Sequence, residues 1–121
     1  MRFLFGALLL VHGLIHIAWF APKPADPRYP FTWRSPWFPK ASEATLKAVA
    51  IPVIVVVIVG FAVSALGVWG VGELAEVWGL TALVSASASV FVTLLLWHPW
   101  FVAAPPIDAA IIATVLMGWV R

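Results

Sequence analysis

Three histidines and one aspartate are the residues of this sequence whose types and spacing could do chemistry. His12 and His16 are four residues apart, so they share one face if their segment is helical. His98 and Asp108 lie far along the chain. Neutral imidazoles with a carboxylate can bind zinc, copper or iron. One of the first two histidines, together with His98, can ligate haem from two helices. The same groups can instead relay protons or bind a quinone or a lipid head group.

Each of these residues also has a purely structural interpretation. A histidine in a membrane-spanning helix often only hydrogen-bonds a neighbouring helix. His98 precedes Pro99 and Trp100, and Asp108 suits the positive end of a helix dipole. A pair of histidines four apart is a weak metal motif without the glutamate of the zincin pattern. We therefore keep two interpretations: packing, and a ligand site formed by His12, His16, His98 and Asp108, with the three histidines as metal ligands.

The composition identifies the solvent in which these residues must lie. Of the 121 residues, 64% are hydrophobic and only 10% are charged, and the mean hydropathy is +1.06. A small soluble domain cannot hide this much apolar side chain, so a soluble globular enzyme is excluded. The chain has no cysteine, which excludes disulfides, thiolate metal sites and iron–sulfur clusters. It has no run of Lys or Arg, so we expect no nucleic-acid partner.

The hydrophobic residues fall into four stretches long enough for helices in lipid. We expect an all-α integral membrane protein, a single four-helix transmembrane domain over residues 1–121. Its predicted spans cover about residues 3–20, 44–69, 74–97 and 105–120. Ser42 can cap the second span. Tryptophan, which is enriched at membrane interfaces, closes each span, at Trp19, Trp69, Trp97 and Trp119.

The fourth span is the shortest of the four. Residues 106–119 would form a helix of about 21 Å, against a hydrocarbon core of about 30 Å. Either residues 100–104 add a bent or interfacial turn, or the bilayer thins locally.

The segment 21–41 is the longest part of the chain outside the spans. It holds six of the ten prolines and five aromatic residues. Proline removes backbone donors and favours extended structure. Because linkers rarely carry so many aromatic residues, we expect an ordered cap on the membrane surface rather than a mobile linker.

Antiparallel spans bring the candidate site residues together. The end of the first span, the end of the third and the start of the fourth must lie on one membrane side. His16, His98 and Asp108 are therefore expected in one half of the bundle, with His12 one turn deeper. The proline-rich cap lies on the same side.

The third span carries a stripe of small and weakly polar residues at helical spacing. Such stripes let helix backbones approach closely, and their hydroxyls bond across helices. We interpret this stripe as a helix-packing face, with a hydroxyl-lined transport path as the alternative. Its residues are Gly79, Ala82, Ser85, Ala86, Ser89 and Thr93.

The segment Leu10–His16, with its His-Gly-Leu-Ile-His run, resembles the first span of a group of small bacterial four-span membrane proteins. In that group the third span is rich in small residues and ends in Trp, and a polar residue opens the fourth. Trp97 and Asp108 fit this outline. After Trp97, however, the sequence has His98 and Pro99 instead of a glycine-containing turn, and its first loop is longer. The layout is also similar to that of DoxX-like proteins. The resemblance implies a bacterial membrane and a four-helix bundle.

These observations favour a non-catalytic accessory or structural subunit of a larger membrane complex, with the lipid bilayer and other subunits as partners. The alternative is a protein that binds haem, a transition metal, a quinone or a lipid through the histidines. A small transporter or channel is the second alternative. We expect the bacterial cytoplasmic membrane as the location. Five basic residues on the cap side, against two on the other, place the cap in the cytoplasm by the positive-inside rule.

Overall fold

The computed structural model describes residues 1–120, and the chain folds into four packed helices. Two of them have a 3-10 helix at one end. The elements are α1 (Arg2–Ile15) continuing into η1 (His16–Phe20), α2 (Glu43–Val68), α3 (Leu74–Leu95), and η2 (Pro99–Ala103) leading into α4 (Ala104–Leu116). The predicted all-α fold with four helices is confirmed.

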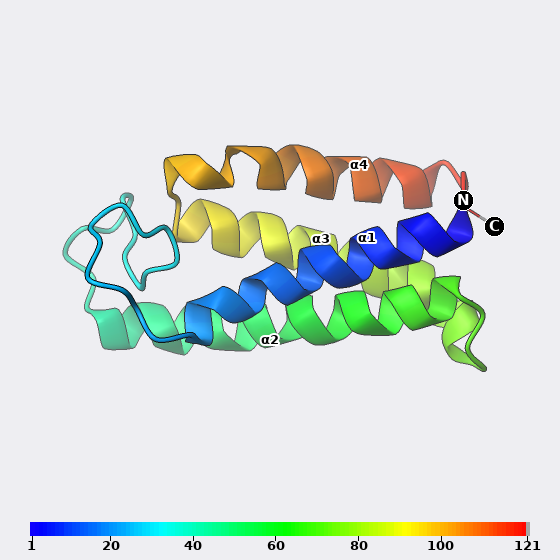
Figure 1. Cartoon of the computed structure of the whole chain (residues 1–121), viewed down its shortest axis with the longest axis horizontal. Coiled ribbons are helices and arrows are strands. Elements are labelled where there is room, and N and C mark those ends of the chain that lie inside the picture. Colours follow the sequence, from blue (N-terminus) through cyan, green and yellow to red (C-terminus); the bar gives the residue numbers. More distant parts are fainter. Residues whose placement is uncertain (121) are drawn as a thin grey trace.

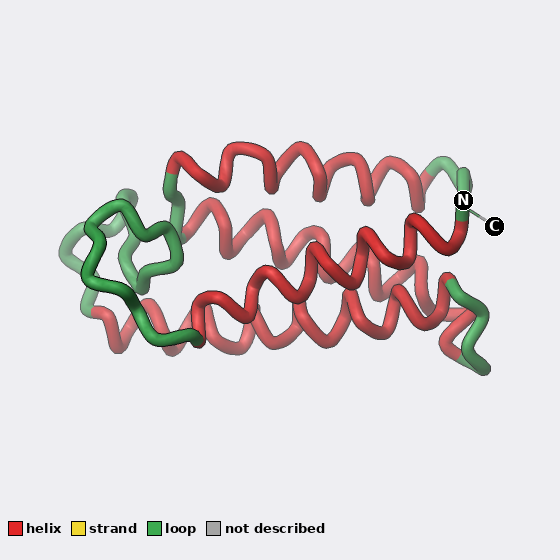
Figure 2. Tube along the Cα trace, viewed as in Figure 1, coloured by secondary structure: helices red, strands yellow, loops and turns green. Residues whose placement is uncertain are grey.

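The helices run antiparallel along the long axis of the molecule (Figure 1). One end carries the long loop between η1 and α2 and the link between α3 and η2. The other end carries both termini and the short turn between α2 and α3. Figure 2 shows that non-helical chain is confined to these two ends. We call them the cap end and the termini end.

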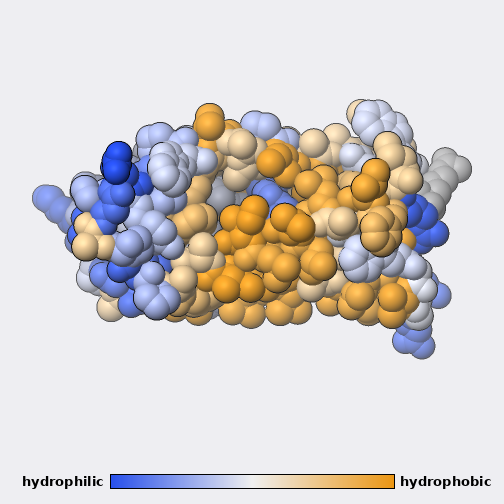
Figure 3. Space-filling view, viewed as in Figure 1, coloured by the Kyte–Doolittle hydropathy of each residue, from blue (hydrophilic) through white to orange (hydrophobic). Residues whose placement is uncertain are grey.

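All four helices are long and apolar enough to cross a membrane. With 26 residues, α2 measures about 39 Å, which exceeds a hydrocarbon core of about 30 Å. Figure 3 shows the matching surface, an orange hydrophobic belt between hydrophilic ends. These candidate spans indicate an integral membrane protein.

The fourth span is extended in the way that the short apolar stretch requires. By itself α4 has only 13 residues. Together with the 3-10 turn η2, the segment Pro99–Leu116 reaches 18 residues. Of the two alternatives for this span, the structure therefore contains the added turn. Pro105 falls in the first turn of α4, where a missing backbone N–H costs nothing.

The start of α2 follows from its local sequence. The hydroxyl oxygen of Ser42 accepts a hydrogen bond from the backbone N–H of Thr45 at 3.1 Å. The predicted N-terminal capping of α2 by Ser42 is therefore present. At the opposite end, the turn into α3 places Gly70 and Gly72 at positive φ, a conformation that residues with a Cβ rarely adopt.

The proline-rich segment packs against the helix ends. The Trp33 side chain is buried, and the indole N–H of Trp37 donates to the backbone carbonyl of Leu94 at 2.6 Å. The ring of Phe31 lies 5.0 Å from that of Trp19. These contacts tie the segment to α2, α3 and η1, as an ordered cap requires. Trp19 differs from the expectation for an interfacial ring, because it is 1% exposed and packs inside this aromatic cluster.

The bundle has two apolar clusters, one toward each end. The cluster near the termini end includes Leu9, Val57, Phe61, Ala65, Val68, Ala82, Ala86 and Ile111. The cluster near the cap end includes Trp19, Trp33, Leu46, Ala50, Ile54, Val92, Leu96 and Phe101. Between the two clusters, α1, η1, α3 and α4 carry buried polar residues, and three of the candidate site residues, His12, His16 and Asp108, lie among them.

Helix packing differs around the bundle. Helices that follow one another in the chain pack closely, whereas the pair α1 and α4 is packed much less closely. Between α2 and α3, a Cβ added at Gly60 would collide with the Ser85 hydroxyl. The hydroxyls of Ser64 and Thr81 also lie 2.7 Å apart across this interface. Ser85 and its buried neighbours on the small-residue stripe therefore lie where α3 contacts other helices, and Gly79 faces Val115 of α4.

Candidate functional site

The His-Gly-Leu-Ile-His run has its polar side chains buried and its apolar side chains exposed, the reverse of an amphipathic helix in a soluble protein. His12, Gly13 and His16 are buried, whereas Leu14 and Ile15 are exposed. Residues at positions i, i+1 and i+4 fall on one side of a helix. The polar groups therefore face the bundle and the apolar groups face lipid. This is the usual arrangement where the solvent is hydrocarbon.

Gly13 sets the distance between α1 and α2. A Cβ added at this position would lie 2.8 Å from the Cβ of Phe61, which is shorter than the van der Waals contact distance between two carbon atoms. The absence of a side chain lets α1 approach α2 here. The His12 ring then packs edge-on against Phe61, with ring centroids 5.4 Å apart.

His12 and Asp108 form the polar contact between α1 and α4. The Nε2 atom of His12 lies 2.8 Å from an Asp108 carboxylate oxygen, and both side chains are buried. An ionised carboxylate can only accept, so His12 donates from Nε2. Asp108 makes no capping bond at the start of its own helix. The contact crosses a helix pair that is packed much less closely than the helices that follow one another in the chain.

The His16 ring forms a hydrogen bond at each of its two nitrogens. Its Nδ1 atom lies 3.0 Å from the backbone carbonyl of His12, which can only accept. Nδ1 therefore carries a proton, and in the neutral ring Nε2 is the acceptor. The Ser89 hydroxyl of α3, 3.2 Å away, then donates to Nε2. We call His12, His16, Ser89 and Asp108 the polar layer, because they join three helices between the two apolar clusters.

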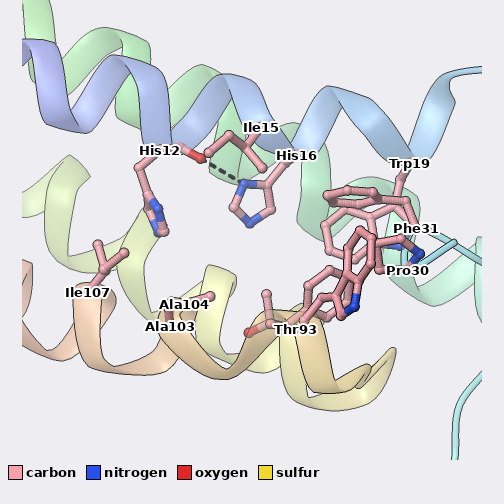
Figure 4. Close-up of a pocket in the computed structure, with 12 residues that line it drawn as sticks. His12, Ile15, His16, Trp19, Pro30, Phe31, Thr93, Ala103, Ala104 and Ile107 are labelled. Carbon is pink, nitrogen blue, oxygen red and sulfur yellow. Dashed lines mark hydrogen bonds between the residues drawn. The ribbon is translucent and has the colours of Figure 1, made fainter. Parts of the chain in front are cut away.

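A cavity of about 220 Å³ lies beside the polar layer, on its cap side. Its walls come from both sides of the seam between α1 and α4, from α3 and from the cap. The lining residues are His12, Ile15, His16, Trp19, Pro30, Phe31, Thr93, Trp100, Phe101, Ala103, Ala104 and Ile107. Figure 4 shows His12 and His16 extending from the first helix toward Ala103, Ala104 and Ile107.

The cavity opens sideways, between α1 and α4. His12, His16 and Trp19 in its inner wall are buried, whereas Ile15 and Trp100 at its rim are exposed. In Figure 3 a small hydrophilic patch interrupts the orange belt between these two helices. Because the rim lies within the hydrophobic belt, a ligand would enter from the lipid and not from water.

Aromatic rings close the cavity toward the cap. The ring centroids of Trp19, Phe31 and Phe101 lie 5.0 to 5.3 Å from one another. The indole Nε1 of Trp19 is buried and has no hydrogen-bond partner in the part of the chain that the structure describes. A buried donor without a partner costs free energy.

His98 lies apart from the other candidate residues. It begins η2, where its Nδ1 accepts from the backbone N–H of Trp100 at 3.2 Å. It faces a different hollow, which is shared with Arg34 and Glu43. Among residues 1–120, no three His, Asp or Glu side chains are grouped as metal ligands. The structure thus joins three of the four predicted site residues. The three-histidine metal site and the haem site with His98 stay predictions without geometric support.

The hydroxyls proposed to line a transport path are turned toward helix contacts. Thr93 donates to the backbone carbonyl of Ser89 at 2.7 Å, and Ser89 contacts His16. Of these hydroxyl residues, only Thr93 lines the cavity. The transport path therefore stays a prediction.

Sequence reasoning missed the role of the cap in the site. Phe31 and Pro30 form part of the cavity wall, and Phe101 from η2 completes it. The available signal was the aromatic content of residues 21–41. That pattern predicts an ordered segment but does not say which rings meet Trp19.

Comparison with known proteins adds no family to this description. The chain matches no family model, no curated protein and no solved structure. The resemblance to small bacterial four-span proteins is therefore supported only at the level of four candidate membrane-spanning helices.

Proposed function

We propose that this protein binds a small, lipid-dissolved molecule with few polar groups in the lateral cavity between α1 and α4. The observation that carries the proposal is the cavity itself, with buried histidines on one wall and an opening within the hydrophobic belt. Apolar pockets with a few convergent polar groups are the default binding sites of proteins. In this function the protein is non-catalytic.

The size of the cavity favours a single ring. An engineered apolar cavity of about 150 Å³ holds benzene, so about 220 Å³ suits one substituted ring or the end of a chain. Porphyrins are much larger, which favours a quinone over haem among the molecules expected from the histidines.

The polar groups of the wall also suit a quinone. Its carbonyl oxygens are acceptors, and the indole N–H of Trp19, a residue of the cavity wall, has no protein partner among residues 1–120. His12 donates from Nε2 to Asp108, which leaves Nδ1 as an acceptor for the hydroxyl of a reduced quinone. A wall with one donor and one acceptor can bind both forms of such a ring.

Duroquinone, a single-ring quinone without a tail, is the probe for the test. We expect it to raise the thermal unfolding temperature of the purified protein in mild detergent, because a ligand that binds only the folded state stabilises it. Ala103→Phe places a ring at the cavity rim and should abolish the shift. Ala109→Phe, at an exposed position of α4 that does not line the cavity, is the matched control and should keep it.

The native sample gives an independent readout. Protein purified from its own membrane should yield a single-ring or quinone-type molecule on organic extraction. A Soret band or stoichiometric metal would contradict the proposal in favour of a haem or metal site. The absence of a duroquinone shift in the unmodified protein would contradict it as well.

A second candidate function is that of an accessory or structural subunit. The observation that favours it is an apolar hollow of about 440 Å³ on the outer face of α2 and α3. Beside it, the Ser85 hydroxyl is buried without a partner among the described residues. A membrane helix with a small, polar face could fill the hollow, since such contacts drive helix association in lipid.

Purification under mild detergent tests this candidate. A companion chain should co-purify with the unmodified protein and be lost in Val84→Trp, which fills the hollow. Phe91→Trp, exposed on the same helix outside the hollow, should retain it. A chain that purifies alone in all three samples would contradict the subunit function.

A further inference from the structure

A second hollow, of about 430 Å³, lies at the cap end, away from the polar layer. It is formed where η1, the cap and the first turns of α2 meet. Its lining residues are Trp19, Phe20, Ala21, Pro22, Lys23, Trp33, Glu43, Lys47 and Ile51. We call Lys23, Trp33 and Lys47 the cationic shelf.

Both ammonium groups of the shelf lie against one indole ring. Lys23 Nζ is 5.5 Å and Lys47 Nζ 5.8 Å from the centroid of the Trp33 ring. Within about 6 Å, a cation is attracted by the face of an aromatic ring. Trp33 is itself buried, so it can hold the two lysines near each other.

The shelf has an excess of positive charge. Lys47 pairs with Glu43 at 3.1 Å. Lys23 instead donates to the backbone carbonyls of Ala18 and Trp19 at the end of η1. Two ammonium groups therefore share one carboxylate. An ammonium group has three N–H donors, and these protein contacts leave at least one free on each lysine.

The electrostatics of Lys23 show the same imbalance. Its burial lowers the pKa of Lys23, the positive charge of Lys47 lowers it further, and the negative charge of Glu43 opposes both effects. A bound anion would offset the repulsion between the two lysines.

The other side of the hollow is apolar. Phe20 is exposed and Ile51 is half-buried, and both lie on the membrane-spanning side of the shelf. A molecule that fits the whole hollow needs an anionic group next to a hydrocarbon chain.

We propose that the cationic shelf binds the head group of an anionic phospholipid. The phosphate oxygens accept from Lys23 and Lys47, and an acyl chain lies along Phe20 and Ile51. This site is separate from the lateral cavity and does not depend on its ligand. The excess of basic residues at the cap end places the shelf in the cytoplasmic leaflet by the positive-inside rule, and that leaflet is the anionic one.

Native mass spectrometry of the detergent-solubilised protein tests the proposal. The sample is mixed with equal amounts of phosphatidylglycerol and phosphatidylcholine, and the retained adducts are counted. We expect a preference for phosphatidylglycerol that weakens with salt. Soluble glycerol phosphate, at the same concentration, should not compete, because it has no acyl chain. Equal retention of the two lipids, or full competition by glycerol phosphate, would overturn the assignment to an anionic lipid.

Lys47→Gln is the informative variant, because it leaves the Lys23 contacts to η1 in place. The preference for phosphatidylglycerol should fall about fivefold, the effect of one basic residue near an anionic surface. Lys40→Gln removes the same charge from the same end of the molecule but does not line the hollow, and should change little. Equal losses in the two variants would show general charge attraction and overturn the site.

Discussion

The two ends of this bundle differ in how their helices meet. Toward the termini, α2 and α3 meet through small residues, and the core is apolar. Toward the cap, the same four helices enclose a polar layer, a lateral cavity and a cluster of aromatic rings. In lipid, helix contacts gain little from the hydrophobic effect, so close packing and hydrogen bonds decide where helices meet.

The difference arises from the glycines that let helices approach closely. Gly60 and Gly67 bring α2 within contact distance of α3. The pair α1 and α4 lacks a comparable contact and is joined by the hydrogen bond between His12 and Asp108. The seam between these two helices is therefore the place where a cavity can persist. The following predictions test this contrast, from the largest expected effect to the smallest.

His12→Ala should destabilise the protein most, because it leaves the Asp108 carboxylate buried without its partner. Leaving a buried charged acceptor without its hydrogen-bond partner costs about 3 kcal/mol or more. The measurement is the free energy of unfolding in bicelles. Removing both partners, in His12→Ala with Asp108→Ala, should restore much of the loss. A double variant as unstable as the sum of the two single variants would contradict the pairing.

Gly13→Ala should separate α1 from α2 at the polar layer. The new Cβ would lie 2.8 Å from the Cβ of Phe61, and such overpacking costs about 1–3 kcal/mol. Gly79→Ala is the matched control, also within a helix, because its Cβ would lie 3.4 Å from the nearest atom. Equal unfolding free energies for the two variants would show that α1 does not depend on close approach.

Ser89→Ala should have a smaller effect. It removes the hydroxyl that donates to His16 Nε2, and interhelical hydrogen bonds in membrane proteins average about 0.6 kcal/mol. Thr114→Ala, which removes a hydroxyl bonded only to its own helix, should cost less. The nitrogen chemical shifts of His16 should move in Ser89→Ala and stay unchanged in the control. An unmoved His16 signal in Ser89→Ala would exclude the contact.

Trp19→Phe should affect ligand binding more clearly than the unfolding free energy. The smaller ring leaves a cavity in the aromatic cluster, which costs some stability, but the lost N–H has no protein partner among the described residues. Duroquinone should nevertheless bind this variant more weakly, because its carbonyl loses a donor. Unaltered binding, measured by titration calorimetry, would remove Trp19 from the ligand site.

The fold was predictable from the sequence because only helices and closed barrels satisfy all backbone hydrogen bonds in lipid. Hydropathy alone indicates four helices, and their bounds agree within a few residues. Ser42 and the turn before α4 also follow from local rules. Antiparallel order was sufficient to place His12, His16 and Asp108 in one half of the bundle.

The details of the site required tertiary contacts. Depth along a helix does not specify which face a residue occupies, so His98 was grouped with the other histidines although it begins η2. Trp19 fits an interfacial pattern in sequence, yet Phe31 and Phe101 bury it. Both differences come from segments outside the long helices, the link before η2 and the cap, whose irregular backbone has no periodicity from which to predict contacts.

The most direct test of the account is solid-state NMR of the protein in lipid bilayers, with labelled histidine and aspartate. The account predicts a dipolar coupling between His12 Nε2 and the Asp108 carboxyl carbon, as the 2.8 Å contact between Nε2 and the carboxylate oxygen requires. Duroquinone should shift the His12 and His16 signals and leave His98 unchanged. A missing coupling, or a shift confined to His98, would contradict the proposal that the polar layer forms a wall of the ligand site.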